Sequence, residues 1–143
     1  MLRRSRLLPL LVAMLALPCA SCGKGGRKPV YPVEGKVLVG KDRQPAAGAL
    51  VIFHPADSSD EDPNKPRAHV GDDGSFTLTT YTQNDGAPAG EYVVTVAWPE
   101  PRKTPFDPVG PDRLGGRYGD PKTSKLRVTV EAKPNALEPI ELP

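Results

Sequence analysis

The chain has 143 residues, enough for one domain of ordinary size. Its 14 glycines and 18 prolines exclude a bundle of long helices, because both residues interrupt helices. Charged residues make up 25% and hydrophobic residues 38% of the chain, a balance that excludes a disordered acidic or basic tail. Two histidines and two cysteines leave little material for a metal centre or for a nucleophile with its base, so composition argues against most enzyme classes.

The first 21 residues have the layout of a secretory signal peptide. Three arginines lie within the first six residues, an apolar run from Leu7 to Leu17 follows, and small residues end the segment. Such a run spans about 16 Å as a helix, too short for the roughly 30 Å of a hydrocarbon core. We therefore expect residues 1–21 to be the signal peptide of an exported protein.

The next residue is a cysteine in a distinctive setting. Cys22 follows Ala20 and Ser21 and precedes Gly23. These residues resemble the lipobox of bacterial lipoproteins, although Cys19 stands where that pattern usually has Leu. In that family the Cys sulfur receives a diacylglyceryl group and the Cys becomes the new N-terminus. The resemblance implies a lipoprotein, with acyl chains such as palmitate on Cys22, anchored to the cell membrane or the outer membrane. The alternative is a secreted protein with a free thiol.

Removal of residues 1–21 changes the charge balance. The chain has 19 basic and 17 acidic residues, and the loss of three arginines leaves 16 basic against 17 acidic ones. Nucleic-acid binding needs a basic stripe, so we expect no nucleic-acid partner. No cysteine follows Cys22, and the exported domain must therefore depend on its apolar core rather than on disulfides.

Residues 22–32 are rich in glycine, proline and basic side chains. This composition is typical of a flexible tether. Lys24, Arg27 and Lys28 would each contribute about 1 kcal/mol beside anionic headgroups, and a solvated linker is the alternative. We expect the segment to join the membrane anchor to a domain formed by residues 33–143.

From Val33 onward the hydrophobic pattern has the period of two that is typical of β-strands. No segment shows a helical period over three turns. The pattern predicts an all-β fold, a single seven-stranded antiparallel β-sandwich. The expected strands lie near residues 33–39, 49–53, 68–70, 76–80, 92–98, 126–130 and 140–142.

Two local expectations concern turns and packing. The sequence Gly71-Asp72-Asp73-Gly74 is typical of a tight hairpin turn, since Gly supplies a positive φ. Alternation after Gly90 predicts that one face of its strand shares a core with Val51 and Phe53. The side chains on that face are Tyr92, Val94, Val96 and Trp98.

Four motifs in this order resemble the carboxypeptidase regulatory-like domain of the transthyretin-like fold. They are Val33-Glu34-Gly35-Lys36-Val37, Pro45 to Phe53, Gly71 to Leu78 and Pro88 to Val96. The later stretch Arg117 to Leu126 is similar to small exported lipoproteins of planctomycete-type bacteria. The resemblance covers about residues 33–142 and implies a fold of seven strands in two sheets, but it implies no single function.

One cluster is a candidate for metal binding or hydrolysis. His54 and His69 lie in neighbouring predicted strands, and the loop 57–62 between them carries the carboxylates of Asp57, Asp60, Glu61 and Asp62. If those strands pair, the imidazoles approach each other, and imidazole with carboxylate is a donor set that suits zinc. The cluster defines the alternative function, a small envelope hydrolase or metal-binding protein.

The remaining signals for catalysis are absent from the sequence. The acidic loop lacks the spacing of an EF-hand, and no Ser-His-Asp or Cys-His arrangement is readable. Transthyretin-like hydrolases of hydroxyisourate end in Tyr-Arg-Gly-Ser, whereas this chain ends in Glu141-Leu142-Pro143. We therefore expect no catalytic residues, no metal and no cofactor.

Residues 99–125 form the longest connection and contain six prolines. Loops of this length are usually functional or disordered. We expect Phe106, Leu114 and Tyr118 to pack the loop down as a cover over a sheet edge, and a recognition arm is the alternative. The expectation for the whole protein is a non-catalytic, lipid-anchored envelope module with an envelope protein or polysaccharide as its partner.

Overall fold

The computed structural model describes residues 26–57 and 63–143. Within these ranges the protein is all-β, with eleven strands and no helix, which confirms the predicted fold class. No helix there is long and apolar enough to cross a membrane. Seven strands lie close to the predicted positions: β2 (Val33–Val39), β4 (Leu50–Pro55), β5 (Arg67–His69), β6 (Ser75–Thr77), β8 (Gly90–Ala97), β9 (Arg127–Val130) and β11 (Ile140–Leu142).

Four further strands of two residues each were not predicted. They are β1 (Val30–Tyr31), β3 (Gln44–Pro45), β7 (Ala87–Pro88) and β10 (Asn135–Ala136). Segments this short carry no readable alternation, because a period of two needs at least four residues to appear. The expected tether thus contains β1, which pairs with β7.

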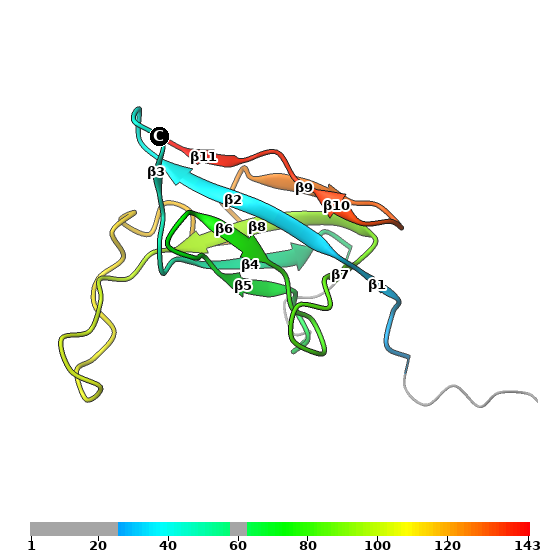
Figure 1. Ribbon diagram of the computed structural model, residues 1–143, viewed down its shortest axis with the longest axis horizontal. Coiled ribbons are helices and arrows are strands. Elements are labelled where there is room, and N and C mark those ends of the chain that lie inside the picture. Colours follow the sequence, from blue (N-terminus) through cyan, green and yellow to red (C-terminus); the bar gives the residue numbers. More distant parts are fainter. Residues whose placement is uncertain (1–25, 58–62) are drawn as a thin grey trace, which may run out of the picture.

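The strands form two main sheets (Figure 1). One has the order β5-β4-β8-β9 and is antiparallel throughout. In the other, β2 pairs antiparallel with β3 and β6 but parallel with β10 and β11. The prediction of a wholly antiparallel fold is therefore wrong for β10 and β11. A hydrophobic period of two has the same form for either direction, so it does not specify how a strand is oriented beside its neighbour.

The core lies where the two sheets face each other. Phe53 of β4 packs against Phe76 of β6, with ring centroids 6.3 Å apart, and joins the sheets. Gly35 of β2 leaves space for Phe76, because a Cβ at that position would lie 2.6 Å from the ring. On β8, Tyr92, Val94 and Val96 are buried and Trp98 packs against the core as a half-buried side chain, as predicted.

The turn at residues 71–74 forms as predicted, and the segments on either side of it run antiparallel. The Gly71 N–H donates to the Ser75 carbonyl at 2.8 Å, and Arg67 and Thr79 form an antiparallel bridge. The Gly74 N–H donates to the Gly71 carbonyl at 3.0 Å, and Gly74 has a φ of +84°. However, β5 pairs with β4 while β6 pairs with β2. The turn therefore carries the chain from one sheet to the other, and the bridge between Arg67 and Thr79 links the two sheets beside it.

Candidate functional site

Residues 27–31 are docked on the domain. The Lys28 N–H donates to the Tyr81 hydroxyl at 3.2 Å, and the Arg27 guanidinium lies 5.2 Å from the centroid of the same ring. Beyond them, β1 pairs with β7. This approach depends on Gly86, which has a φ of +95° and where a Cβ would lie 1.8 Å from the Tyr31 carbonyl oxygen. The ordered domain therefore begins several residues before Val33.

Tyr81 is held in place by the carboxylate of Asp85. This carboxylate accepts backbone N–H groups from Thr80 at 2.7 Å, Tyr81 at 2.9 Å and Thr82 at 2.8 Å. Burial alone would raise the pKa of Asp85, but these N–H groups outweigh burial and hold the pKa below its ordinary value. The charged form of Asp85 thus stabilises the loop that supports the docked residues.

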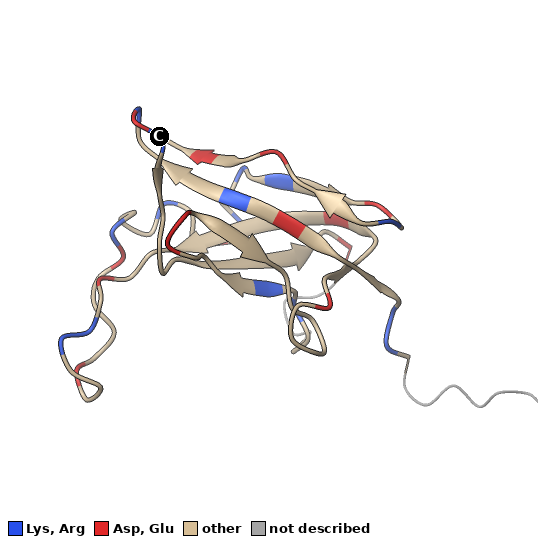
Figure 2. Ribbon diagram, viewed as in Figure 1, with Lys and Arg blue, Asp and Glu red and all other residues tan. Residues whose placement is uncertain are grey.

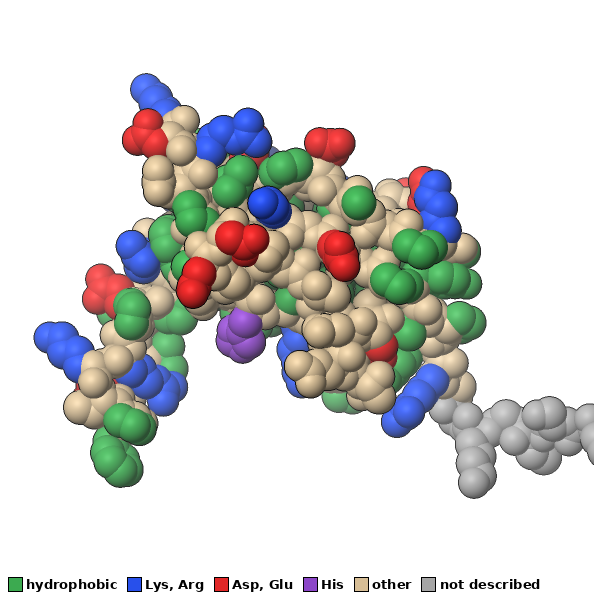
Figure 3. Space-filling view, in the orientation of Figure 1, with side chains coloured by type: hydrophobic (Ala, Val, Ile, Leu, Met, Phe, Trp, Pro, Cys, Tyr) green, Lys and Arg blue, Asp and Glu red, His purple; other side chains and the backbone are tan. Residues whose placement is uncertain are grey.

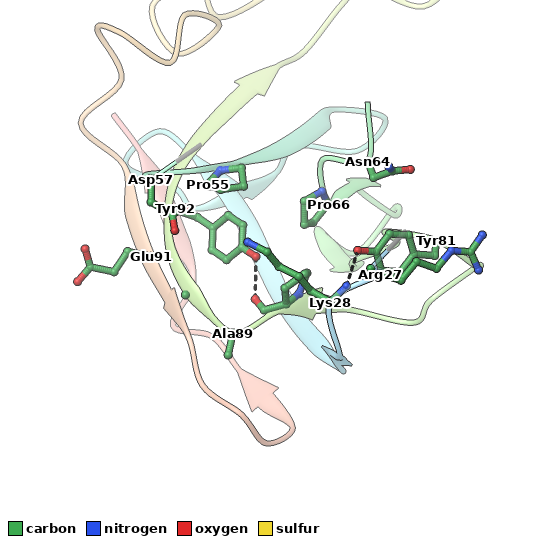
Figure 4. A pocket seen from close by; sticks show the side chains of 13 residues that line it. Arg27, Lys28, Pro55, Asp57, Asn64, Pro66, Tyr81, Ala89, Glu91 and Tyr92 are labelled. Carbon is green, nitrogen blue, oxygen red and sulfur yellow. Dashed lines mark hydrogen bonds between the residues drawn. The ribbon is translucent and has the colours of Figure 1, made fainter. Parts of the chain in front are cut away.

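The docked residues form one wall of a pocket at one end of the sheets (Figure 4). Its volume is about 240 Å³, and the other walls come from the end of β4, from Asn64 and Pro66, and from the corner between β7 and β8. The corner is fixed by the Tyr92 hydroxyl, which donates to the Pro88 carbonyl at 2.7 Å. The pocket is therefore built on strand ends and a hydrogen-bonded corner.

The pocket combines aromatic rings with charges of both signs. Arg27 and Lys28 contribute two cations, and Asp57 and Glu91 contribute two carboxylates. In Figure 4 Asp57 and Glu91 lie on one side of the pocket, with the Glu91 carboxylate pointing outward, and Arg27 lies on the other side beside Tyr81. The Lys28 side chain reaches toward Tyr92 between them. The formal charges cancel, so the pocket does not select for a simple anion or cation. Its chemistry suits a partner that also carries apolar surface and both charges.

The structure does not bring the two histidines together. The predicted strands do pair, but the register sets His69 opposite Leu50 and His54 opposite Val93. His54 thus lies four residues further along β4 than Leu50, about 13 Å at the rise of a strand. The His54 Nε2 is 2.9 Å from the Thr95 hydroxyl, whereas His69 is exposed.

The acidic part of the same candidate is also divided. Asp57 lines the pocket of Figure 4, whereas Asp60, Glu61 and Asp62 lie outside the described residues. In the described ranges, no group of three or more His, Cys, Asp or Glu side chains has an arrangement that could hold a metal ion. The described residues therefore do not show the cluster of two histidines and carboxylates on which a hydrolase or metal-binding function would depend.

The long connection 99–125 has two parts with different environments. Its second part packs on the domain: Leu114 is only 3% exposed, and the Tyr118 carbonyl accepts the Val96 N–H at 3.0 Å. Its first part, residues 99–111, projects from the sheets as an arm (Figure 1). Phe106 is 96% exposed, so the prediction of burial is correct for Leu114 and wrong for Phe106. The cover and the projecting arm are both present, in succession.

The base of the arm is rigid. The Asp112 carboxylate accepts the N–H groups of Trp98 at 2.9 Å, Leu114 at 3.0 Å and Gly116 at 2.9 Å. Burial would raise the pKa of Asp112, but these three donors outweigh it and hold the pKa below its usual range. The Arg113 guanidinium stacks 3.8 Å from the Trp98 ring centroid. The arm is thus fixed where it leaves β8.

The sequence alone does not predict that several of these residues line a pocket. Arg27, Lys28, Tyr81 and Glu91 come from three separate segments, and only folding brings them to one pocket. Asp85 and Asp112 had a local signal, since Asp often accepts backbone N–H groups in turns. Residues 1–21 and the expected lipid site Cys22 lie outside the described residues.

No protein-family model and no curated protein matches the chain. Among solved structures, it is similar to a DUF3823 family protein from Bacteroides ovatus ATCC 8483, with 12% identity and a TM-score of 0.43 over 78% of this chain and 44% of that one. It is also similar to a 9R-lipoxygenase from Cyanothece PCC8801, with 9% identity and a TM-score of 0.43 over 84% of this chain and 18% of that one. The chain spans less than half the length of either protein.

Proposed function

We propose that this protein is a non-catalytic, lipid-anchored module of the bacterial cell envelope. Residues 1–21 would direct export, and acylated Cys22 would anchor the mature chain to the cell membrane or the outer membrane. The domain would be a β-sandwich of the transthyretin-like, carboxypeptidase regulatory-like type. It would bind an envelope protein or polysaccharide through the pocket of Figure 4.

The observation that carries this proposal is the docking of residues 27–31. Arg27 and Lys28 contact Tyr81, and β1 pairs with β7. Only five residue steps separate Cys22 from Arg27, and they span at most about 17 Å when fully extended. An acylated Cys22 would therefore hold the pocket end of the domain close to the bilayer and leave the domain free to lie along the membrane surface. A long flexible tether would not do this.

The pocket itself supports binding rather than catalysis. Its tyrosines are engaged in structure: the Tyr92 hydroxyl donates to Pro88, and the Tyr81 hydroxyl accepts from Lys28. Aromatic rings with a polar tip and paired opposite charges are common at surfaces that recognise proteins or sugars. The pocket thus offers fixed contact groups to a partner at the membrane surface.

Mass spectrometry of the membrane fraction tests the anchor. We expect a mature chain that begins at Cys22 with the mass of attached acyl chains, and we expect Cys22→Ala to abolish this species. Ser5→Ala is the control, because Ser5 lies in the expected signal peptide but outside the residues that resemble the lipobox, and its loss should leave the modification intact. A soluble chain with a free Cys22 thiol would contradict the proposal.

Capture from envelope extract tests the pocket. Material retained by the wild-type chain should be lost with the double variant Arg27→Ala/Lys28→Ala, which removes both cations. Lys41→Ala is the control, because Lys41 is exposed in the connection between β2 and β3, at the other end of β2 from β1 and the pocket. Equal retention by both variants would show that the pocket is not the binding site.

A further inference from the structure

We propose that the pocket of one copy receives the tip of the arm, residues 99–111, of a second copy, so that copies of this chain associate head to tail. The inference deepens the proposed function, on which it rests, because it names a partner for the same pocket. The contact would place Phe106 of one copy among the pocket side chains of the next.

The two surfaces lie at opposite ends of one strand. Gly90, Glu91 and Tyr92 line the pocket at the start of β8, and the arm leaves the sheet after β8 ends at Ala97. Eight residues of strand span about 27 Å, and Figure 1 shows the arm directed away from the pocket end. The arm therefore does not reach the pocket of its own copy. A contact between two different surfaces repeats from copy to copy and produces rows rather than a closed pair.

The tip of the arm has the features of a preformed anchor. Phe106 is 96% exposed and Val109 is 62% exposed, and Figure 3 shows apolar side chains gathered at the end of the arm. The turn below them is closed, because the Asp107 carboxylate accepts the Thr104 N–H at 2.7 Å and the Asp107 N–H donates back to the Thr104 carbonyl at 3.2 Å. A large aromatic side chain on an ordered turn loses little entropy when it binds, and such side chains dominate many interfaces.

The pocket has room for this anchor. Its volume is about 240 Å³, and its wall combines tyrosine and proline side chains with a larger share of polar surface. An apolar cavity of about 150 Å³ accepts benzene, so a phenyl ring fits with room for adjoining backbone. Proline and aromatic rings pack well against an aromatic side chain because their surfaces are flat and apolar. The shape of the site therefore permits insertion of Phe106.

The charges beside the anchor and around the pocket are complementary. Arg102 and Lys103 precede the tip, and Asp107 follows Phe106; Figure 2 shows charges of both signs on the arm. The pocket is bordered by Asp57 and Glu91 on one side and by Arg27 on the other, and the Lys28 side chain reaches toward Tyr92 between them. Each sign of charge on the arm thus has an opposite sign at the pocket, which favours entry of the arm in one orientation over the reverse.

The proposed anchor at Cys22 makes such a contact effective. One aromatic side chain and a few charge pairs give an interface far smaller than that of a stable complex, so association in dilute solution is weak. Confinement to one membrane raises the effective concentration of the copies. We therefore expect association in membranes and only at high concentration in detergent.

Disulfide cross-linking in membranes tests the contact directly. Full-length Phe106→Cys is co-expressed with full-length Ala89→Cys, because Ala89 is an exposed residue that lines the pocket. Oxidation should join the two variants. The matched control pairs Phe106→Cys with Glu138→Cys, whose exposed site lies between β10 and β11, and no cross-link should form. Acylation blocks the Cys22 sulfur, and mass spectrometry of the same sample separates failure of the anchor from failure of the contact.

Sedimentation in detergent gives a second measure. Phe106→Ala should weaken association about 10- to 100-fold, whereas Val109→Ala should change it by less than about threefold. Ala89→Trp fills the pocket but keeps the arm, whereas Phe106→Ala keeps the pocket open but lacks the aromatic anchor. A mixture of the two variants should therefore form pairs, with the arm of the first in the pocket of the second, and these pairs should not extend into rows.

Three results would overturn the inference. The first is cross-linking of Phe106→Cys to position 89 that is no stronger than cross-linking to position 138. The second is an association constant that Phe106→Ala leaves unchanged. The third is burial of the Phe106→Cys thiol by lipid in vesicles that hold one copy each. The third result would assign the arm to the bilayer instead.

Discussion

Gly86→Ala tests whether the first described residues are bound to the domain. Gly86 has a φ of +95°, and an added Cβ would lie 1.8 Å from the Tyr31 carbonyl oxygen and 2.9 Å from the Pro32 Cα. The substitution therefore combines two penalties. A left-handed conformation costs a residue with a Cβ about 1–2 kcal/mol, and overlap with neighbouring backbone adds about 1–3 kcal/mol. We expect the free energy of unfolding to fall by about 2–5 kcal/mol in total.

The matched control is Gly40→Ala. Gly40 also has a positive φ, +73°, but a Cβ there has no atom within 4 Å. It should cost only the conformational penalty of about 1–2 kcal/mol. The difference between the two variants in urea unfolding then reports the overlap with Tyr31 and Pro32, provided that the m-value is unchanged.

A second readout separates local release from general destabilisation. The domain can relieve the overlap by releasing β1, and this would expose the bond after Arg27 to trypsin. We expect faster cleavage there in Gly86→Ala but not in Gly40→Ala. Equal unfolding free energies for the two variants, together with an unchanged cleavage rate after Arg27, would refute the docking of residues 27–31.

Three further predictions concern the core and the two structural carboxylates. Val94→Ala should lower the free energy of unfolding by about 1–3 kcal/mol, because Val94 is fully buried. Val109→Ala on the exposed arm should change the free energy of unfolding by less than about 0.5 kcal/mol. Similar losses in the two variants would contradict the assignment of the core. Asp112→Ala removes the acceptor of three backbone N–H groups, so limited trypsin digestion should cut faster after Arg113 while the sheets stay folded, and a wild-type rate would show that other contacts fix the arm. The pKa of Asp85 lies below its ordinary value of 3.8 in the fold, so its contribution is complete above about pH 5 and is lost as the pH falls through the lowered pKa. Asp85→Asn should therefore show a flatter decrease of unfolding free energy than the wild type between about pH 5 and pH 3 in urea titrations, and an equal decrease would exclude Asp85 as a source of acid lability.

The strand positions and the inward face of β8 were readable from the sequence alone. A strand that is buried on one side repeats its apolar residues every second position, whatever its neighbours are. Tyr92, Val94 and Val96 follow this rule and are buried. The same rule explains why residues 26–57 and 63–143 contain no helix, since no apolar period of 3.6 competes with the strand period there.

The candidate site was less readable, because it depends on contacts between distant segments. The sequence allows the strands that carry His54 and His69 to pair, but it does not specify the register that separates the two histidines. A shift of the register by two residues keeps the same side chains on the same face of the sheet. The hydrophobic pattern therefore shows which face of a strand is buried, but it does not show which residues of two strands lie opposite each other. Phe106 illustrates the same limit, since an apolar side chain in a loop has no periodicity to show whether it is buried.

Fold class and strand order along the chain thus follow from local chemistry. Alternating side chains, glycine and proline act within a few residues, and the unfolded chain already carries that information. The parallel direction of β10 and β11, the placement of β5 and β6 in different sheets, and the docking of Arg27 and Lys28 on Tyr81 were decided only by tertiary structure. These features depend on which of several sterically possible partners each segment meets in the packed core, and that choice is made by the burial of the whole domain rather than by any one segment.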